Sequence, residues 1–117
     1  MSSFKIFHNP RCSKSRQTLQ ILKEHDCEVE VILYLETAID ESVLVDILGK
    51  MSLSPRDLLR KGEQEFKDNN LKNSNYSDQE IIKFMIQHPK LIERPIVISG
   101  NKALIGRPPE LILDLIS

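Results

Sequence analysis

The chain has 117 residues, a formal net charge of −1, and 28% charged and 40% hydrophobic residues. This length and composition are typical of one globular domain, and the near-zero net charge does not favour a nucleic-acid partner. The sequence contains neither an apolar run as long as a membrane span nor a signal peptide. We therefore expect a cytoplasmic protein with no membrane partner.

The first third of the chain predicts a strand–helix–strand unit. Residues 4–7 and 28–35 are rich in β-branched and aromatic side chains, and both are predicted to form strands. Residues 13–25 carry apolar side chains at helical spacing and are predicted to form the helix between them. Strands joined in this way lie parallel, and the loop after the first strand falls at the sheet edge where α/β folds bind ligands.

The middle of the chain, about residues 38–90, predicts a helical insertion. Three helices are expected there, beginning at Asp40 or Ser42, at Ser54-Pro55, and at the capping box Ser77-Asp78-Gln79-Glu80. The third helix ends before Pro89. Residues 63–75, between the second and third helices, are polar and predict short turns or a mobile loop.

The last third returns to strands. Residues 95–99 and 102–105 are predicted to pair as a hairpin around Gly100-Asn101, and Pro108-Pro109 opens a final helix. The fold class is therefore α/β. Its core has the order β-α-β…β-β-α, with the helical insertion between the second and third strands of one domain that spans residues 1–117.

Cys12 is the candidate nucleophile. It lies where the first strand gives way to the first turn of a helix, and the free backbone N–H groups and the dipole of such a turn stabilise a negative charge. Positive charge also lies within a few residues, on Arg11, Lys14, Arg16 and, when it is protonated, His8. Such surroundings lower a cysteine pKa from about 8.5 toward 3.5–7.5, and the thiolate is the reactive form.

The ordinary alternative for a lone cysteine is a small buried hydrophobic residue. Polar neighbours make Cys12 a poor fit for that role, whereas Cys27 is predicted to be structural. A helix between the two would separate them by roughly 20 Å, and a disulfide needs Cα atoms within about 7 Å, so no native disulfide is expected. Two cysteines and three scattered histidines also predict no metal site.

Three arginines complete the candidate site. Arg60 ends the segment that begins at Ser54, Arg94 immediately precedes Pro95, and Arg107 lies at the head of the last helix. Each could be an ordinary solvated side chain. Together, however, planar guanidinium groups match a doubly charged tetrahedral oxyanion, provided that Glu93 and Glu110 are turned away.

A set of ordered motifs resembles the glutaredoxin-linked arsenate reductase family, in its short-chain branch. The motifs are His8-Asn9-Pro10-x-Cys12, Tyr34-Leu35-Glu36-Thr37, Leu58-Leu59-Arg60, Glu93-Arg94-Pro95-Ile96-Val97 and Gly106-Arg107-Pro108. The resemblance implies a thioredoxin-like fold, in which the proline after Arg94 is cis and the residue before it faces the reactive cysteine. The chain departs from the family pattern after the cysteine, where Ser13-Lys14-Ser15 replaces the usual Gly-Thr-Ser.

The resemblance also implies a reaction. Cys12 would attack the arsenic of a bound arsenate that Arg60, Arg94 and Arg107 hold, and His8 would help to keep Cys12 ionised. Ser15 is a further candidate for stabilising the thiolate. Glutathione would be the co-substrate, glutaredoxin the protein partner, and no cofactor would be tightly bound.

Other functions stay open at this stage. One is a reductase of a different oxyanion or thiol substrate, and another is a redox-responsive regulator on the same fold, such as those that bind RNA polymerase. Such regulators usually carry a C-x-x-C switch, whereas Ser15 occupies the second cysteine position here. A cysteine-dependent phosphatase would need Cys-x5-Arg, and this chain has Cys-x3-Arg at Arg16.

Overall fold

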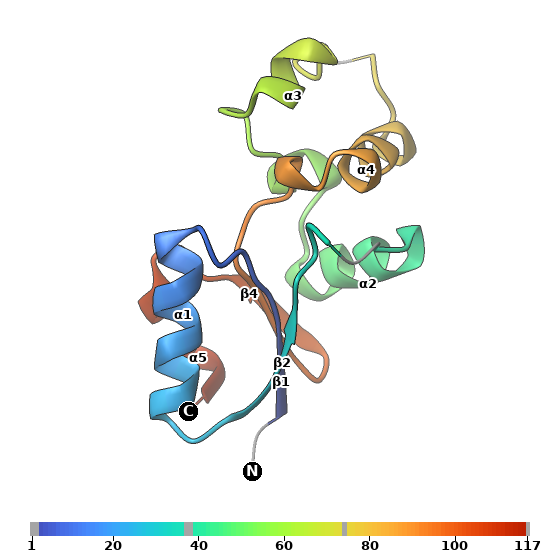
Figure 1. Cartoon of the computed structure of the whole chain (residues 1–117). Helices are drawn as coiled ribbons and strands as arrows, with labels where there is room; N and C mark the ends of the chain where they lie inside the picture. Colours follow the sequence, from blue (N-terminus) through green and yellow to red (C-terminus); the bar gives the residue numbers. More distant parts are fainter. Residues whose placement is uncertain (1–2, 37–38, 74, 117) are drawn as a thin grey trace. The chain divides into compact units, whose positions relative to one another are not determined.

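The computed structural model describes residues 3–36, 39–73 and 75–116. Figure 1 follows the elements along the chain. The strands are β1 (Ser3–Phe7), β2 (Glu28–Ile32), β3 (Ile96–Ser99) and β4 (Lys102–Ile105). The α-helices are α1 (Ser13–Glu24), α2 (Glu41–Met51), α3 (Gln64–Asp68), α4 (Asp78–Gln87) and α5 (Leu113–Ile116), and short 3-10 helices cover Pro55–Leu58 (η1), Pro89–Leu91 (η2) and Pro109–Ile112 (η3).

The chain divides into two compact units. Residues 1–37 and 94–117 form the sheet unit, which holds all four of the strands named above, and residues 38–93 form the helical unit. The helical unit begins where the sequence predicted the insertion. The assignment of residues 1–117 to one domain stays a prediction.

The sheet has the strand order β2-β1-β3-β4. β1 runs parallel to β2, with Phe7 opposite Ile32, whereas β3 is antiparallel to both β1 and β4. A parallel pair joined through a helix, followed by an antiparallel hairpin, is the β-α-β…β-β-α core that the sequence predicted. The thioredoxin-like fold class is therefore confirmed.

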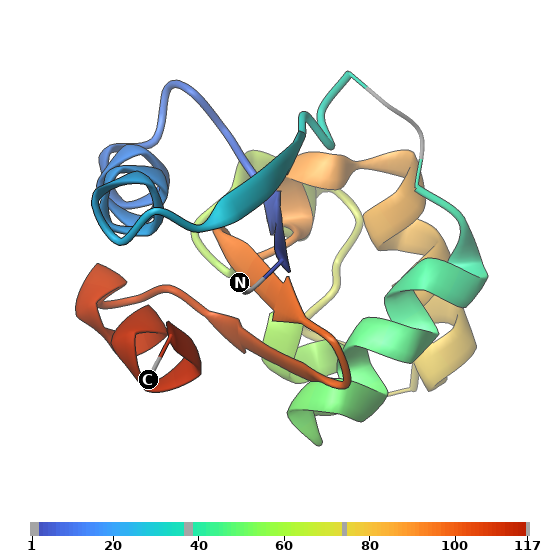
Figure 2. The same ribbon diagram turned by 90° about the horizontal axis from the view of Figure 1, so that it is seen from below.

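The core of the sheet unit forms where α1 and the C-terminal helices pack on the sheet. Figure 2 shows α1 and α5 on the same side of the strands. Five side chains, each at most 2% exposed, make this core: Phe4, Ile6, Leu22, Val97 and Ile112. Burying a side chain of this size stabilises the fold by about 1.5–3 kcal/mol. Leu22 belongs to α1, so its burial holds α1 against the sheet, and Cys12 lies at the start of that helix.

Several elements differ from the sequence prediction. The helix expected at Ser54-Pro55 is only the short 3-10 helix η1, and the final helix begins as the 3-10 helix η3 before α5. β2 ends at Ile32 rather than at Leu35, because the chain turns there: the N–H of Tyr34 donates to the carbonyl of Ile32 (3.0 Å). Apolar residues follow the end of the strand because Tyr34 is buried outside it, at 1% exposure. The polar segment 63–75, predicted as turns or a mobile loop, contains the short helix α3.

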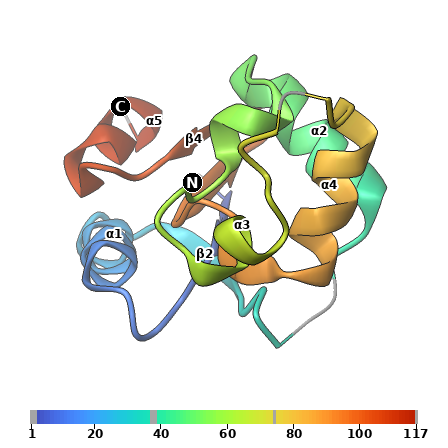
Figure 3. The same cartoon turned by 90° about the horizontal axis from the view of Figure 1, so that it is seen from above.

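The helical unit has its own buried side chains. α2 and α4 pack together, as Figure 3 shows from above, and they bury Leu44, Ile47, Ile81 and Met85. The predicted capping box is present at the start of α4, where Ser77 and Glu80 exchange backbone-to-side-chain hydrogen bonds of 3.0 and 3.2 Å. Among the residues that the structure describes, no helix is long and apolar enough to cross a bilayer.

Candidate functional site

Cys12 occupies the N-cap position of α1. Its backbone is extended (φ −95°, ψ 121°), and its N–H donates to the carbonyl of Asn9 (3.0 Å). The side chain of Asn9 accepts a further bond from the N–H of Arg11 (3.0 Å), which closes the loop between β1 and α1. Cys12 therefore lies at the start of the helix, as the sequence predicted, and is partly exposed.

The surroundings of Cys12 favour its ionised form. Burial raises the pKa of the thiol and is the largest single influence, whereas hydrogen bonds from the backbone N–H of Ser15 and from the side chain of Arg94 lower it. The positive charge of Arg94 and the N–H of Lys14 act in the same direction. The net result is a Cys12 pKa below the ordinary cysteine value, which increases the fraction of the nucleophilic thiolate at a given pH.

Arg94 brings two groups together within the sheet unit. Its guanidinium interacts with the thiol of Cys12 and with the phenol of Tyr34, and these interactions raise the pKa of Arg94 even though burial lowers it. The ring of Tyr34 stacks on Phe7, with ring centroids 6.3 Å apart. The peptide bond between Arg94 and Pro95 is cis, as the resemblance implied.

Tyr34 is the site residue that the sequence analysis missed. Its motif was noticed, but its place in an apolar run predicted an ordinary strand residue. The available signal was a polar hydroxyl in that run, because a buried tyrosine usually places its hydroxyl against a polar partner. Here that partner is Arg94.

His8 and Ser15 form a buried pair beside Cys12. The Nδ1 atom of His8 lies 2.7 Å from the hydroxyl of Ser15, which also accepts a bond from the N–H of Asn9 (3.1 Å). Burial lowers the pKa of His8, and the positive charges of Lys23 and Arg16 lower it further. The lowered pKa favours the neutral imidazole, whereas the sequence analysis assigned His8 a positive charge only in its protonated form. The contact that the structure shows for His8 is the one with Ser15.

Arg107 lies in the same unit as Cys12. Its Nη1 atom donates to the backbone carbonyl of Arg94 (3.1 Å), so two of the three arginines that the sequence singled out are in contact. The peptide bond between Arg107 and Pro108 is also cis. Gly106, immediately before Arg107, donates its N–H to the carbonyl of Pro95 (2.9 Å), which places the two arginine–proline segments side by side.

Gly106 lies too close to its neighbours for a side chain to fit there, which gives a first testable prediction. A Cβ atom there would lie 2.8 Å from Oγ1 of buried Thr18 and 3.0 Å from Cγ of Pro95. We expect Gly106→Ala to lower the free energy of unfolding by about 1–3 kcal/mol because this packed region must shift. Urea unfolding measures the change.

Gly49 provides the matched control for this prediction. No atom lies within 4 Å of a Cβ built there, and the residue is in α2. Gly49→Ala is expected to stabilise the protein by up to about 1 kcal/mol through helix propensity. If Gly106→Ala were as stable as the wild type, the prediction would be wrong, because Thr18 and Pro95 could then move apart at little cost in free energy.

Arg60 belongs to the helical unit, where it pairs with Glu93. The Nη1 atom of Arg60 lies 3.0 Å from Oε1 of Glu93. The sequence analysis required Glu93 to be turned away from an arginine site, and for Arg60 that condition is not met. The structure brings Cys12, Arg94 and Arg107 together in the sheet unit and describes Arg60 in the other unit.

Cys27 has a different character from Cys12. Both thiols are free, but burial raises the pKa of Cys27, and the negative charge of Asp26 raises it further. Cys27 packs against the core of the sheet unit. It therefore has the properties of a structural thiol.

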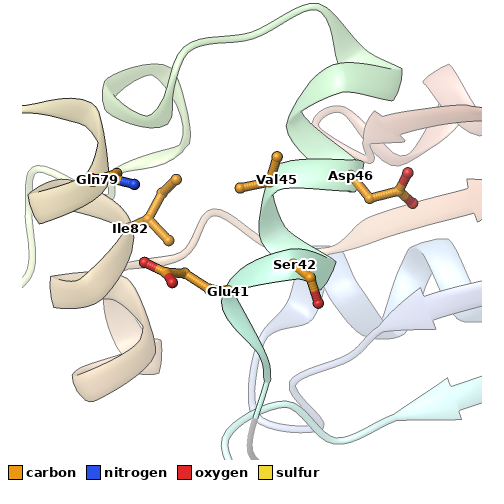
Figure 4. Close-up of a pocket in the computed structure, with 6 residues that line it drawn as sticks. All are labelled: Glu41, Ser42, Val45, Asp46, Gln79 and Ile82. Atoms are coloured by element: carbon orange, nitrogen blue, oxygen red, sulfur yellow. The ribbon is translucent and has the colours of Figure 1, made fainter.

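A groove in the helical unit lies between α2 and α4. It is lined by Glu41, Ser42, Val45, Asp46, Gln79 and Ile82. Figure 4 shows Val45 and Ile82 pointing toward one another across it. Its lining contains no cysteine, histidine or arginine, so the groove carries none of the chemistry of the Cys12 loop. Across residues 3–36, 39–73 and 75–116, no group of three or more histidine, cysteine or acidic side chains could hold a metal ion.

Comparison with known proteins identifies the family. Residues 7–115 match the ArsC family. The chain belongs to the ArsC family. This confirms the resemblance to arsenate reductases that the sequence motifs indicated.

Curated relatives cover nearly the whole chain. An uncharacterized protein of Escherichia coli K12, YfgD, is 50% identical over 113 residues, which are 96% of this chain and 95% of that protein. An arsenate reductase of Neisseria meningitidis is 44% identical over 111 residues, 94% of this chain and 95% of that enzyme. An arsenate reductase of Escherichia coli is 40% identical over 116 residues, covering 99% of this chain and 82% of that enzyme.

A solved structure gives the same result. The arsenate reductase from Vibrio cholerae superposes with a TM-score of 0.94 at 42% sequence identity, covering 97% of both chains. This ArsC family member is therefore similar to an arsenate reductase along almost its whole length, in fold as well as in sequence.

Proposed function

We propose that the protein is a cytoplasmic arsenate reductase that uses glutathione and glutaredoxin, with Cys12 as the nucleophile. One observation carries the proposal: the Cys12 thiol has a lowered pKa and lies against the guanidinium of Arg94. A thiolate beside a fixed cation suits attack on an anionic electrophile. Relatives named arsenate reductase, at 40–44% identity over most of the chain, support arsenate as that electrophile.

The arginines would hold the substrate. The guanidinium of Arg107 contacts the backbone of Arg94, and we propose that the side chains of both residues hold one tetrahedral oxyanion, with Arg60 as a third donor. The N–H groups that stabilise the Cys12 thiolate also stabilise charge in this loop. The role of His8 would be to hold Ser15, and through it the start of α1, in place.

The reaction needs two electrons, and two thiols supply them. The Cys12 sulfur forms a bond to arsenic and a water molecule leaves. The glutathione thiol then attacks the Cys12 sulfur, which breaks the sulfur–arsenic bond, reduces arsenic from the pentavalent to the trivalent state and releases arsenite. The mixed disulfide between Cys12 and glutathione is reduced by glutaredoxin, which returns the Cys12 thiol.

A coupled assay tests the proposal. Purified protein, glutathione, glutaredoxin, glutathione reductase and NADPH are mixed with and without arsenate, and NADPH oxidation is followed. We expect a rate that requires arsenate, glutathione and glutaredoxin together. An arsenate-dependent rate that persists without glutaredoxin would show that glutaredoxin is not required. If the folded protein gave no arsenate-dependent rate, arsenate would be rejected as its substrate.

The two thiols provide a separate prediction. The Cys12 pKa is lowered and the Cys27 pKa is raised, so at pH 7 Cys12 is expected to carry a larger thiolate fraction than Cys27. Iodoacetamide should therefore label Cys12 first, and the gap between the two rates should narrow as the pH rises and Cys27 ionises. Peptide mass spectrometry over time measures both rates. Equal labelling of the two thiols at pH 7 would contradict the lowered Cys12 pKa.

A further inference from the structure

Thr18 lies on the buried face of α1, between the candidate site and the hydrophobic core. The buried residues of this helix are Ser15, Thr18 and Leu22, whose helical spacing places them on one face. Ser15 belongs to the surroundings of Cys12, whereas Leu22 belongs to the core of the sheet unit. Thr18 lies between them and is completely buried, at 0% exposure.

The side chain of Thr18 contacts two separate parts of the chain. Its hydroxyl donates to the carbonyl of Lys14 (2.8 Å), in the first turn of its own helix, and lies 3.4 Å from the carbonyl of Gly106. A hydroxyl has one hydrogen, so the two carbonyls share it. The methyl group also lies against Gly106, because a Cβ atom built there would be 3.1 Å from Cγ2 of Thr18. Both branches of this side chain therefore determine how closely α1 approaches Gly106.

Gly106 connects this contact to the arginines of the sheet unit. Its N–H donates to the carbonyl of Pro95 (2.9 Å), and the side chain of the next residue, Arg107, donates to the carbonyl of Arg94 (3.1 Å). All of these residues belong to the sheet unit, as Cys12 does. A displacement of Gly106 relative to α1 would therefore move both arginine–proline segments relative to Cys12.

We propose that Thr18 is a positioning residue, which holds Gly106 at a fixed distance from α1 and thereby keeps Arg94 and Arg107 in place for a tetrahedral oxyanion beside Cys12. The inference rests on the proposed function, which assigns these arginines to the oxyanion. Groups that bind a reacting anion must be placed to within about 0.5 Å, and an error of about 1 Å can cost a factor of 10² in rate. A single buried contact that sets this distance can therefore affect substrate binding.

The competing explanation is that Thr18 has only a local role. A threonine in a helix often donates its hydroxyl to the carbonyl four residues earlier, as Thr18 does to Lys14. A residue with that role alone would affect the stability of α1 but not the affinity for the oxyanion. The two explanations therefore differ in whether KM changes.

Three substitutions of Thr18 test the proposal in the coupled assay. Thr18→Val replaces the hydroxyl with a methyl group, Thr18→Ala removes both branches, and Thr18→Ser keeps the hydroxyl. The KM for arsenate is expected to rise about three- to ten-fold in Thr18→Val and Thr18→Ala, within the range for the loss of one hydrogen bond, while kcat falls by a smaller factor. In Thr18→Ser, KM should stay close to the wild-type value.

Two outcomes of this assay would overturn the proposal. One is a wild-type KM in Thr18→Ala, which would leave Thr18 with a local role. The other is an equal KM in Thr18→Ser and Thr18→Ala, which would show that the hydroxyl does not position the arginines. Thr18→Ala keeps the test decisive if the valine methyl group prevents folding, because alanine adds no atom beside the two carbonyls.

Leu22→Val is the matched control for a general loosening of α1. Leu22 is on the same face of the helix and is equally buried, but it belongs to the hydrophobic core. Leu22→Val should lower the midpoint of urea unfolding and leave the KM for arsenate unchanged. If it raised KM as much as Thr18→Ala does, the effect would come from loss of packing, and the specific role of Thr18 would be rejected.

A binding measurement separates this inference from the proposed function. The rate at which iodoacetamide labels Cys12 is measured with increasing arsenate or inorganic phosphate, which needs no turnover. Each rate is divided by the rate of the same variant without anion, so that a change in the reactivity of Cys12 itself cancels. Half-protection at a higher anion concentration in Thr18→Ala than in wild type and Thr18→Ser supports the inference even if arsenate is not reduced. Equal half-protecting concentrations in all three proteins overturn it and leave the proposed function standing.

Discussion

Cys12→Ser is expected to abolish arsenate-dependent NADPH oxidation. A serine hydroxyl is not ionised at neutral pH and cannot form the disulfide with glutathione, so the loss should be at least about 10³-fold. The variant should fold normally because serine is a favoured N-cap residue and Cys12 is the N-cap of α1. The measurement is the coupled assay, with thermal unfolding as the check on folding.

Cys27→Ser is the natural control for that experiment. It removes the other thiol, whose raised pKa and packing against the core indicate a structural role. It should retain the arsenate-dependent rate and lose only some stability. Activity that survives in Cys12→Ser but disappears in Cys27→Ser would reverse the assignment of the nucleophile.

Replacing Arg94 should have the second-largest effect. Arg94→Gln removes the charge and the hydrogen bond that stabilise the Cys12 thiolate, so the Cys12 pKa should rise and iodoacetamide labelling at pH 7 should slow. The same change removes a cation from the oxyanion. We expect kcat/KM for arsenate to fall about 10²–10³-fold, the usual loss for an electrostatic donor that acts on a developing charge.

Arg94→Lys separates charge from shape. A lysine ammonium keeps the positive charge but lacks the planar fork of the guanidinium, which reaches both Cys12 and Tyr34. The Cys12 pKa should therefore rise less in Arg94→Lys than in Arg94→Gln, while substrate affinity still falls.

Arg11→Gln is the matched control for Arg94. It removes a guanidinium from an exposed residue next to Cys12 and should leave both the labelling rate and kcat/KM within about twofold of wild type. If Arg11→Gln and Arg94→Gln had equal effects, a general positive charge, and not the contact with Arg94, would explain the reactivity of Cys12.

Most of the fold could be predicted from local sequence patterns. β-branched and aromatic residues indicated the strands, apolar residues at helical spacing indicated the helices, and the capping box at Ser77 gave the start of α4. The position of Cys12 at a helix start followed from the same patterns, because a turn signal at Asn9-Pro10 separates the strand from the helix. These features depend on neighbours that are close in sequence.

The features that the sequence could not supply depend on distant contacts. The pairing of Arg60 with Glu93 needs the bridge between Leu59 and Ile92, which joins residues 33 positions apart. The lowered pKa of His8 needs its burial, and no local pattern shows how deeply a loop residue is buried. The contribution of Tyr34 likewise depends on Arg94, which lies 60 positions later in the chain.

The contact between Tyr34 and Arg94 joins the two places where the chain leaves and re-enters the sheet unit. Residue 37 is the last residue before the helical unit and Arg94 is the first after it. The helical unit is therefore one continuous insertion between Tyr34 and Arg94. Because the residues that flank this insertion contact each other, the insertion can change in sequence and length without disturbing the sheet unit. Cys12, Tyr34 and Arg94 all lie in the sheet unit, so changes in the sequence or length of residues 38–93 can leave the contacts among these three side chains intact.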